Sequence, residues 1–250
     1  MSDQPKPLSD ADRLSRENAR LRGDLLTFGN RISHDLRTPL GSILNTTELL
    51  REVAGEKDAA VGPLTTSIGD SVDEMMRLIK SFSMLARASG GPVTIQPVRM
   101  EEIVSGILQQ LESKILKKGA TVDFPDSWPE VNGVATWVEF AWWNFITNAI
   151  QHGGNKIQLG WTREGSEHRF WIADDGPGVP ARLRARLFQT FDSLHEPSSM
   201  RGLGLSTVQR LVDLQGGRCG HEAENAAGTY FYFTLPMGDV SQDTRGATVG

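Results

Sequence analysis

The sequence has one cysteine, no long apolar run and no cluster of basic residues, and each of these absences excludes a class of protein. Cys219 is the only cysteine among 250 residues, which excludes a disulfide framework and a cysteine-based metal cluster. No apolar stretch approaches the roughly 18 residues that a membrane span needs. The 26 basic residues are scattered and the formal net charge is -5, so the composition argues against a nucleic-acid partner.

The N-terminal segment, residues 1–10, is polar and carries prolines, which is not the pattern of a signal peptide. We therefore expect a soluble, cytoplasmic protein to which any membrane-borne signal is brought by another protein. The hydrophobic fraction of 38% can support a core, and 250 residues suffice for one large domain or two small ones.

Residues 9–54 are predicted to form one long helix with a coiled-coil seam, because core positions recur at heptad spacing. The seam consists of Ala11, Leu14, Asn18, Leu21, Leu25, Phe28 and Ile32. A polar residue at a core position, here Asn18, typically fixes the register of a two-stranded coil. An amphipathic helix packed inside a monomer is the alternative, and the length of the seam favours the dimer.

A second helix is predicted after a bend at Pro39 and a turn at residues 55–58. Pro63 lies where a first-turn proline is tolerated. Two heptad sets follow: Ile68, Met75 and Phe82, and Val72, Ile79 and Ala86. Two amphipathic helices joined by a short loop form an antiparallel hairpin, and two hairpins form a dimeric four-helix bundle.

The pattern changes after a predicted hinge at residues 89–92. Strands are predicted at residues 93–98, 121–124, 156–162, 168–173, 218–222 and 229–235, and helices at residues 101–118, 136–151 and 203–214. Such mixing predicts a two-layer α/β sandwich. The expected fold is therefore multidomain: an all-α helical hairpin followed by an α/β two-layer sandwich. The polar tail, residues 238–250, is expected to be disordered.

The segment from Ser33 to Leu40 carries a candidate nucleophile. His34 and Thr38 are four residues apart and share a helix face, and Asp35 neighbours Thr38. An exposed imidazole beside a carboxylate can act as a nucleophile, because the acid accepts the ring proton. A surface histidine beside an acid is also common, so this pattern alone does not establish catalysis.

Two amides, Asn144 and Asn148, lie on one face of the apolar helix predicted at residues 136–151. Buried amides need polar partners, which Mg²⁺ or phosphate oxygens would supply. Amides that cap nearby backbone are the alternative.

The turn from Asp174 to Gly178 follows an alternating strand, and its glycines allow close backbone approach to a ligand. Gly202 and Gly204 open a helix, where free N–H groups and the helix dipole favour anions.

Taken together, these segments resemble the two-component sensor histidine kinases. The matching segments are the H box at residues 34–40, the N box at 142–150, the first glycine box at 174–180, the F box at 188–191, the second glycine box at 202–205 and the closing segment at 216–217, 228–231 and 235–236. The resemblance covers about residues 24 to 236. It implies a dimerisation and histidine phosphotransfer domain at residues 24–90 and an ATP-binding catalytic domain at residues 93–237, and the heptad seam predicts an N-terminal coiled-coil extension at residues 1–23.

The resemblance also implies an activity, autophosphorylation by ATP, and the roles of the residues at the phosphoacceptor. His34 would accept the γ-phosphoryl group of ATP with Asp35 as its base, and Thr38 would help water dephosphorylate a partner. That partner is a response regulator, whose receiver domain takes the phosphoryl group on an aspartate. The protein is expected to be a homodimer and to receive its signal from a separate sensor protein through the N-terminal coil.

In the ATP-binding domain the resemblance implies that Asn144 and Asn148 hold Mg²⁺ and that Asp174 binds the adenine amino group. The four glycines would contact the nucleotide: Gly176, Gly178, Gly202 and Gly204. Related hydrolases carry Glu at the position of Asn144, where it activates water, whereas Asn cannot act as a base.

Three residues depart from the family pattern. Gln151 stands where many relatives have Lys, Asp175 where Asn is usual, and Met200 where a glycine is usual. The alternative function is therefore a non-kinase dimeric phosphotransfer or docking scaffold with a degenerate ATP domain. A third possible function, after the kinase and the scaffold, is that of a protein that acts mainly as a phosphatase of its regulator.

Overall fold

The computed structural model describes residue 36 and residues 40–52, 61–89, 93–188, 203–222 and 228–237. The chain divides into two compact units, one formed by residues 1–92 with 190–207 and the other by residues 93–189 with 208–250. Each unit is described by itself. The predicted coiled-coil seam, the bend at Pro39, the turn at residues 55–58 and the C-terminal tail lie outside the described residues.

In the first unit the structure describes a helix at residues 40–52 and the helix α2 (Val61–Ser89). The second helix predicted from the sequence is thus confirmed, with Pro63 in its first turn. The two helices pack together where α2 has a glycine, since a Cβ built at Gly69 would lie 3.9 Å from Leu44 Cδ1.

The two predicted heptad sets of α2 differ in exposure. Val72 lies three residues from Gly69, on the face turned toward Leu44, and Val72 and Ala86 are each 2% exposed. Ile68, Met75 and Phe82 are 42%, 41% and 37% exposed. Ile79, which belongs to the same set as Val72 and Ala86, is half-buried. One apolar stripe of α2 is therefore largely buried, while the other remains accessible.

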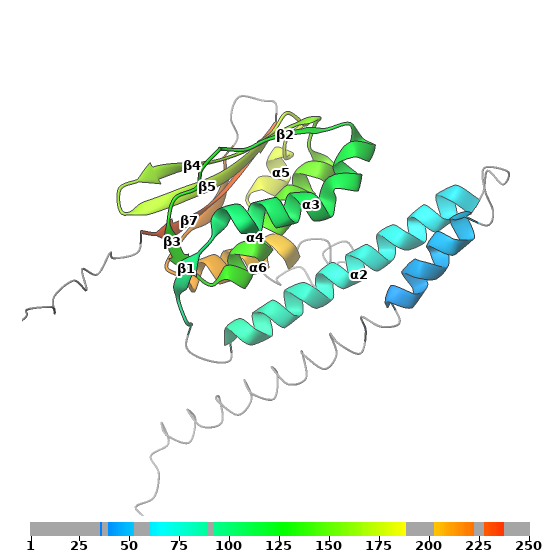
Figure 1. The fold of residues 1–250 in the computed structure, drawn as a ribbon, viewed down its shortest axis with the longest axis horizontal. Coiled ribbons are helices and arrows are strands. Elements are labelled where there is room, and N and C mark those ends of the chain that lie inside the picture. Colours follow the sequence, from blue (N-terminus) through cyan, green and yellow to red (C-terminus); the bar gives the residue numbers. More distant parts are fainter. Residues whose placement is uncertain are drawn as a thin grey trace, which may run out of the picture. The chain divides into compact units, whose positions relative to one another are not determined.

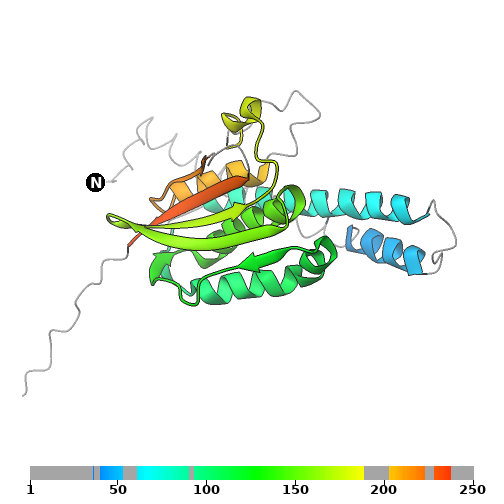
Figure 2. The same ribbon diagram turned by 90° about the horizontal axis from the view of Figure 1, so that it is seen from above.

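The second unit is a mixed sheet with helices on one face (Figures 1 and 2). Its strands are β1 (Gln96–Val98), β2 (Thr121–Asp123), β3 (Val131–Gly133), β4 (Lys156–Glu164), β5 (Glu167–Asp174), β6 (Cys219–Glu222) and β7 (Thr229–Pro236). Five of them form a sheet in the order β2-β4-β5-β7-β6, in which only β2 and β4 run parallel. β1 and β3 pair separately as an antiparallel ribbon.

The core lies between the sheet and the helices α3 (Met100–Lys118) and α4 (Ala135–His152). α4 contains neither glycine nor proline, and its large apolar side chains recur at helical spacing, so one face can be buried. Trp142, Phe145 and Ile146 are fully buried. Trp142 contacts Phe233 edge to face at a ring distance of 5.4 Å, and Phe145 stacks on Phe231 at 5.4 Å. These contacts fix α4 on β7.

The structure differs from the predicted secondary structure at three elements. The strand β3 and the short helix α5 (Ala181–Arg184) were not predicted, because each has too few residues for a period to show. β1 covers only Gln96–Val98 of the predicted residues 93–98. Within the described ranges, no helix combines the length and apolarity needed to cross a bilayer. The predicted cytoplasmic location stays a prediction.

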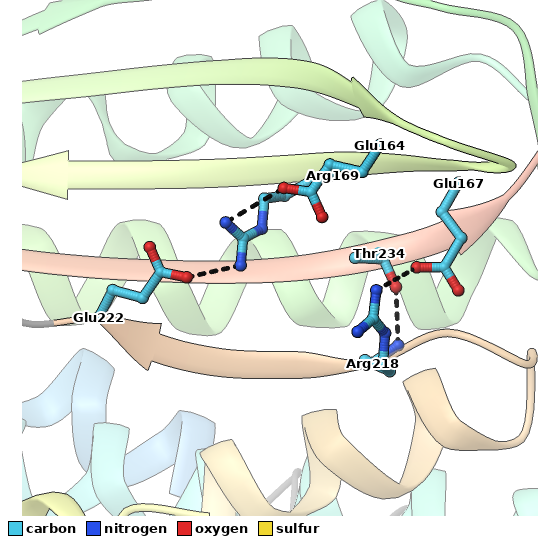
Figure 3. A network of polar contacts seen from close by, with 6 residues as sticks. All are labelled: Glu164, Glu167, Arg169, Arg218, Glu222 and Thr234. Atoms are coloured by element: carbon cyan, nitrogen blue, oxygen red, sulfur yellow. Dashed lines mark hydrogen bonds and ion pairs between the residues drawn. The ribbon is translucent and has the colours of Figure 1, made fainter.

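The outer face of the sheet carries a polar network (Figure 3). Arg169 on β5 donates to Glu222 on β6 at 2.6 Å and pairs with Glu164 on β4 at 3.2 Å. Its guanidinium carbon also lies 3.6 Å from the ring centre of Tyr232 on β7. The Arg169 side chain is only 16% exposed, so it links four strands from a largely desolvated position.

Candidate functional site

The predicted phosphoacceptor residues, His34, Asp35 and Thr38, lie outside the described residues. Leu36, between them in the sequence, is helical and 44% exposed, and a helix is also described at residues 40–52. Gly202 and Met200 also lie outside the described part. The roles of these five residues therefore stay predictions.

Asn144 and Asn148 lie on one face of α4, as predicted, and both are half-buried. The Asn144 side-chain amide nitrogen donates to the Phe140 carbonyl at 2.7 Å, and the amide oxygen has no hydrogen-bond partner among the described residues. Asn148 makes no side-chain hydrogen bond to the described part of the chain. Among the described residues, the Asn144 nitrogen thus bonds nearby backbone and the Asn148 amide does not.

Asp174 ends β5, and its backbone is held between Ile157 on β4 and Thr229 on β7. One carboxylate oxygen, Oδ1, accepts a hydrogen bond of 2.9 Å from the Gly176 backbone N–H. This local turn fixes the carboxylate. The other oxygen has no hydrogen-bond partner among the described residues, so it can accept a bond from a ligand.

The glycines of this turn approach backbone from elsewhere in the same chain. A Cβ built at Gly176 would lie 2.6 Å from the Gly153 Cα, and one built at Gly178 would lie 2.8 Å from the Gly228 oxygen. Gly178 also has a φ of 72°, a conformation that favours glycine. In addition, the Gly228 N–H donates to the Gly176 oxygen at 2.7 Å. Within the described residues, these close approaches hold the turn against the end of α4 and the start of β7.

The C-terminal end of α4 meets the turn at Gly153. A Cβ built at Gly153 would lie 2.6 Å from the Asp174 Cγ, so the aspartate side chain rests directly on this corner. Gly153 was not among the predicted site residues, although the Gly153-Gly154 pair after an apolar helix is a local signal for such a corner. The described residues thus bring the end of the helix that bears Asn148 against Asp174.

The remaining predicted site residues are distributed as follows. Phe188 of the F box is half-buried and meets Phe231 edge to face at 6.2 Å, and Phe231 in turn stacks on Phe145 of α4. Gly204 is the second residue of α6 (Leu203–Asp213). Gln151 is exposed at the end of α4.

The composition of this site fits a magnesium nucleotide. It offers amide oxygens, which suit a hard cation, and a fixed carboxylate oxygen, which can accept a bond from an amino group. A separate shallow pocket of about 350 Å³ beside β2, β4 and β5 is lined by Phe124, Trp161 and Trp171 and by none of the predicted site residues.

Two protein families match successive parts of this chain. The family described as His Kinase A (phospho-acceptor) domain matches residues 24–91. The family described as histidine kinase-, DNA gyrase B- and HSP90-like ATPase matches residues 133–239. The chain belongs to the histidine kinase family. A helical phosphoacceptor region followed by an α/β ATPase domain is the fold of these histidine kinases, as predicted.

Individual proteins resemble the chain over most of its length. The methanogenesis regulatory histidine kinase FilI of Methanothrix harundinacea is 32% identical over 82% of this chain and 24% of its own length. Cyanobacterial phytochrome A of Nostoc is 27% identical over 93% of this chain and 30% of its own. Full-length ShkA, solved in complex with AMPPNP, gives a TM-score of 0.59 at 26% identity over 84% of this chain and 45% of that one. The chain therefore spans about a quarter to a third of the curated relatives named here.

Proposed function

We propose that the protein is an ATP-dependent protein-histidine autokinase that phosphorylates His34. The observation that carries the proposal is the half-buried amide of Asn148, which has no described partner and lies on a helix whose end packs against the Asp174 carboxylate. The proposed domain bounds are residues 24–90 for dimerisation and phosphotransfer and residues 93–237 for ATP binding, between a coil at residues 1–23 and a tail at residues 238–250.

In the proposed ATP site, Asn144 and Asn148 hold Mg²⁺ through their amide oxygens, and Asp174 accepts a hydrogen bond from the adenine amino group. Gly176 and Gly178 keep the turn that bears Asp174 close to backbone, while the N–H groups around Gly202 and Gly204 bind phosphate. The bound metal neutralises charge on the phosphates. The Asn144 amide cannot remove a proton from water, which favours transfer to a histidine over hydrolysis.

At the phosphoacceptor, a ring nitrogen of His34 forms a bond to the γ-phosphorus. The bond from that phosphorus to the bridging oxygen breaks and ADP leaves. Asp35 accepts the proton of the ring and orients it. The phosphoryl group then passes from His34 to an aspartate in the receiver domain of a response regulator. Thr38, one helical turn from His34, positions the water that removes the phosphoryl group from that regulator.

We further propose that the working form is a homodimer. Ile68, Met75 and Phe82 recur at heptad spacing on α2 and are each more than a third exposed. A stripe of this kind is accessible to a second copy of the hairpin, which would complete a four-helix bundle. A separate sensor protein would act through the N-terminal coil.

The test is incubation with γ-labelled ATP and Mg²⁺, followed by exposure of the labelled protein to acid and to base. A phosphohistidine is labile in acid and stable in base. We expect His34→Gln to abolish the label while nucleotide binding, measured by calorimetry, stays at the wild-type value. Full labelling of His34→Gln would show that another residue is the phosphoacceptor.

A second pair of variants tests the ATP site. Asn148→Asp should weaken binding of an ATP analogue, since loss of one polar partner of a ligand costs about 1–3 kcal/mol. Asn155→Asp makes the same charge change at an exposed position a few residues later and should leave binding unchanged. If the wild type bound no nucleotide, the chain would instead be a docking scaffold with a degenerate ATP domain.

A further inference from the structure

Lys118, the last residue of α3, makes contacts that the sequence did not predict. Its ammonium nitrogen lies 3.1 Å from the Ala149 oxygen, 2.6 Å from the Ile150 oxygen and 2.7 Å from the Gly153 oxygen. An ammonium group has three N–H donors, so each can go to one of these carbonyls. The side chain is half-buried. Lys118 thus caps the C-terminal end of α4 from a neighbouring helix.

This cap replaces the usual one. The last carbonyls of a helix lack partners within the helix, and glycine often ends a helix in a left-handed conformation that supplies them. Gly153 after α4 is instead extended, with φ -76° and ψ -178°. The Lys118 ammonium therefore provides both hydrogen bonds and a positive charge at the negative end of the helix dipole.

The capped segment is also the one that joins the two halves of the proposed ATP site. Asn148 immediately precedes Ala149, whose carbonyl Lys118 binds. Gly153, whose carbonyl Lys118 also binds, is in backbone contact with Gly176 and supports the Asp174 carboxylate. Loss of the cap would free the last turn of α4 and the corner that follows it together.

We propose that Lys118 is a positioning residue of the nucleotide site, which holds the Asn148 amide and the Asp174 carboxylate at a fixed separation through the end of α4. This inference rests on the proposed function. Lys118 itself does not touch the nucleotide. It acts through the carbonyls of Ala149, Ile150 and Gly153.

The opposite end of α4 offers a matched comparison. Gln215 is 8% exposed, accepts a hydrogen bond of 2.7 Å from the Val134 N–H and donates one of 2.9 Å to the Leu211 oxygen. Val134 is the N-cap of α4, so Gln215 caps the N-terminal end as Lys118 caps the other. Asn148 lies 14 residues after Val134, which corresponds to about 20 Å of helix. A variant that loses only the Gln215 cap should therefore leave the positions of Asn148 and the Asp174 turn unchanged.

The experiment compares three methionine substitutions. Lys118→Met removes the donors and keeps the length of the stem, Lys117→Met makes the same change at the exposed neighbour, and Gln215→Met removes the other cap. Calorimetry would give the Kd of a magnesium ATP analogue well below each melting temperature. We expect Lys118→Met to raise the Kd roughly tenfold, since small displacements of binding groups cost affinity steeply. Lys117→Met and Gln215→Met should leave the Kd unchanged.

A spectroscopic measurement without nucleotide separates positioning from general stability. Amide NMR spectra of Lys118→Met should show shifts for the Asn148 side chain and for Gly153 and Gly176, and those of Gln215→Met should not. Lys118→Gln keeps two N–H donors and should give the same changes at smaller size if Lys118→Met does not fold. Binding by folded Lys118→Met at the wild-type Kd would overturn the inference, as would equal losses in Gln215→Met. A wild type that binds no nucleotide would contradict the proposed function, and the NMR comparison would still decide the role of Lys118.

Discussion

Gly176→Ala tests the contact between the Asp174 turn and the end of α4. The added Cβ would lie 2.6 Å from the Gly153 Cα and 2.7 Å from both the Gly153 carbonyl carbon and the Gly154 nitrogen. All three are backbone atoms, so no side chain can rotate away. Since ordinary van der Waals contact begins at 3.4 Å, the two segments must separate by about 0.8 Å.

The free energy that this separation costs can be estimated from other substitutions that enlarge a side chain in a close-packed core. Forcing a methyl group into a close-packed contact typically costs about 1–3 kcal/mol. For a unit of this size, that lowers the melting temperature by about 2 to 12 °C. The displaced groups include the Asp174 carboxylate and the corner after Asn148, so affinity for an ATP analogue should fall roughly tenfold or more. Thermal unfolding followed by circular dichroism, together with calorimetric titration, would measure both effects.

Gly106→Ala is the matched control. It makes the same chemical change inside α3, where a built Cβ meets no heavy atom within 4 Å. Alanine stabilises a helix interior relative to glycine by about 0.5–1 kcal/mol, so this variant should melt higher and bind the nucleotide analogue as the wild type does. The reasoning would be refuted if Gly176→Ala kept both the melting temperature and the affinity of the wild type.

Three further predictions follow from the packing and the charges. Met75→Glu should lower the mass found by light scattering toward that of a monomer, because it places a charge on the exposed stripe of α2; an unchanged mass would place the dimer contact elsewhere. Arg169→Met should lower the free energy of unfolding in urea by about 1–2 kcal/mol, through loss of two ion pairs and the contact with Tyr232, while Arg99→Met, whose pair with Glu102 is fully exposed, should not change it. Burial and the nearby Arg163 charge lower the pKa of His168 below its ordinary 6.5, so the unfolded chain takes up more protons as the pH falls below about 7. Stability should therefore decrease from pH 7.5 to 5.5, and less so in His168→Phe; equal slopes would contradict this.

Local chemistry made much of the fold predictable. α3 and α4 begin and end within about one residue of the predicted positions, because the apolar spacing that predicts each helix is encoded in the segment itself. The strands β4 and β5 were predicted from their alternation of apolar and polar residues. The shared face of Asn144 and Asn148 was also predicted, since it depends only on the geometry of one helix.

The exposure of the α2 stripes required the structure. Both heptad sets are equally apolar in the sequence, and only the packing of Gly69 against Leu44 shows which face lies inside the hairpin. The same holds for the strand order, in which β7 lies between β5 and β6, because strand pairing joins residues that are distant in the chain.

By itself, the sequence determined the helices α3 and α4, the strands β4 and β5, and the residue types available for chemistry. These features depend on neighbours within a few positions. Only the tertiary structure decided that Gly176 rests on Gly153 and that Lys118 caps a helix 31 residues later in the chain. Such contacts depend on how separate elements pack, and no local pattern specifies which carbonyl a lysine at the end of a helix will find.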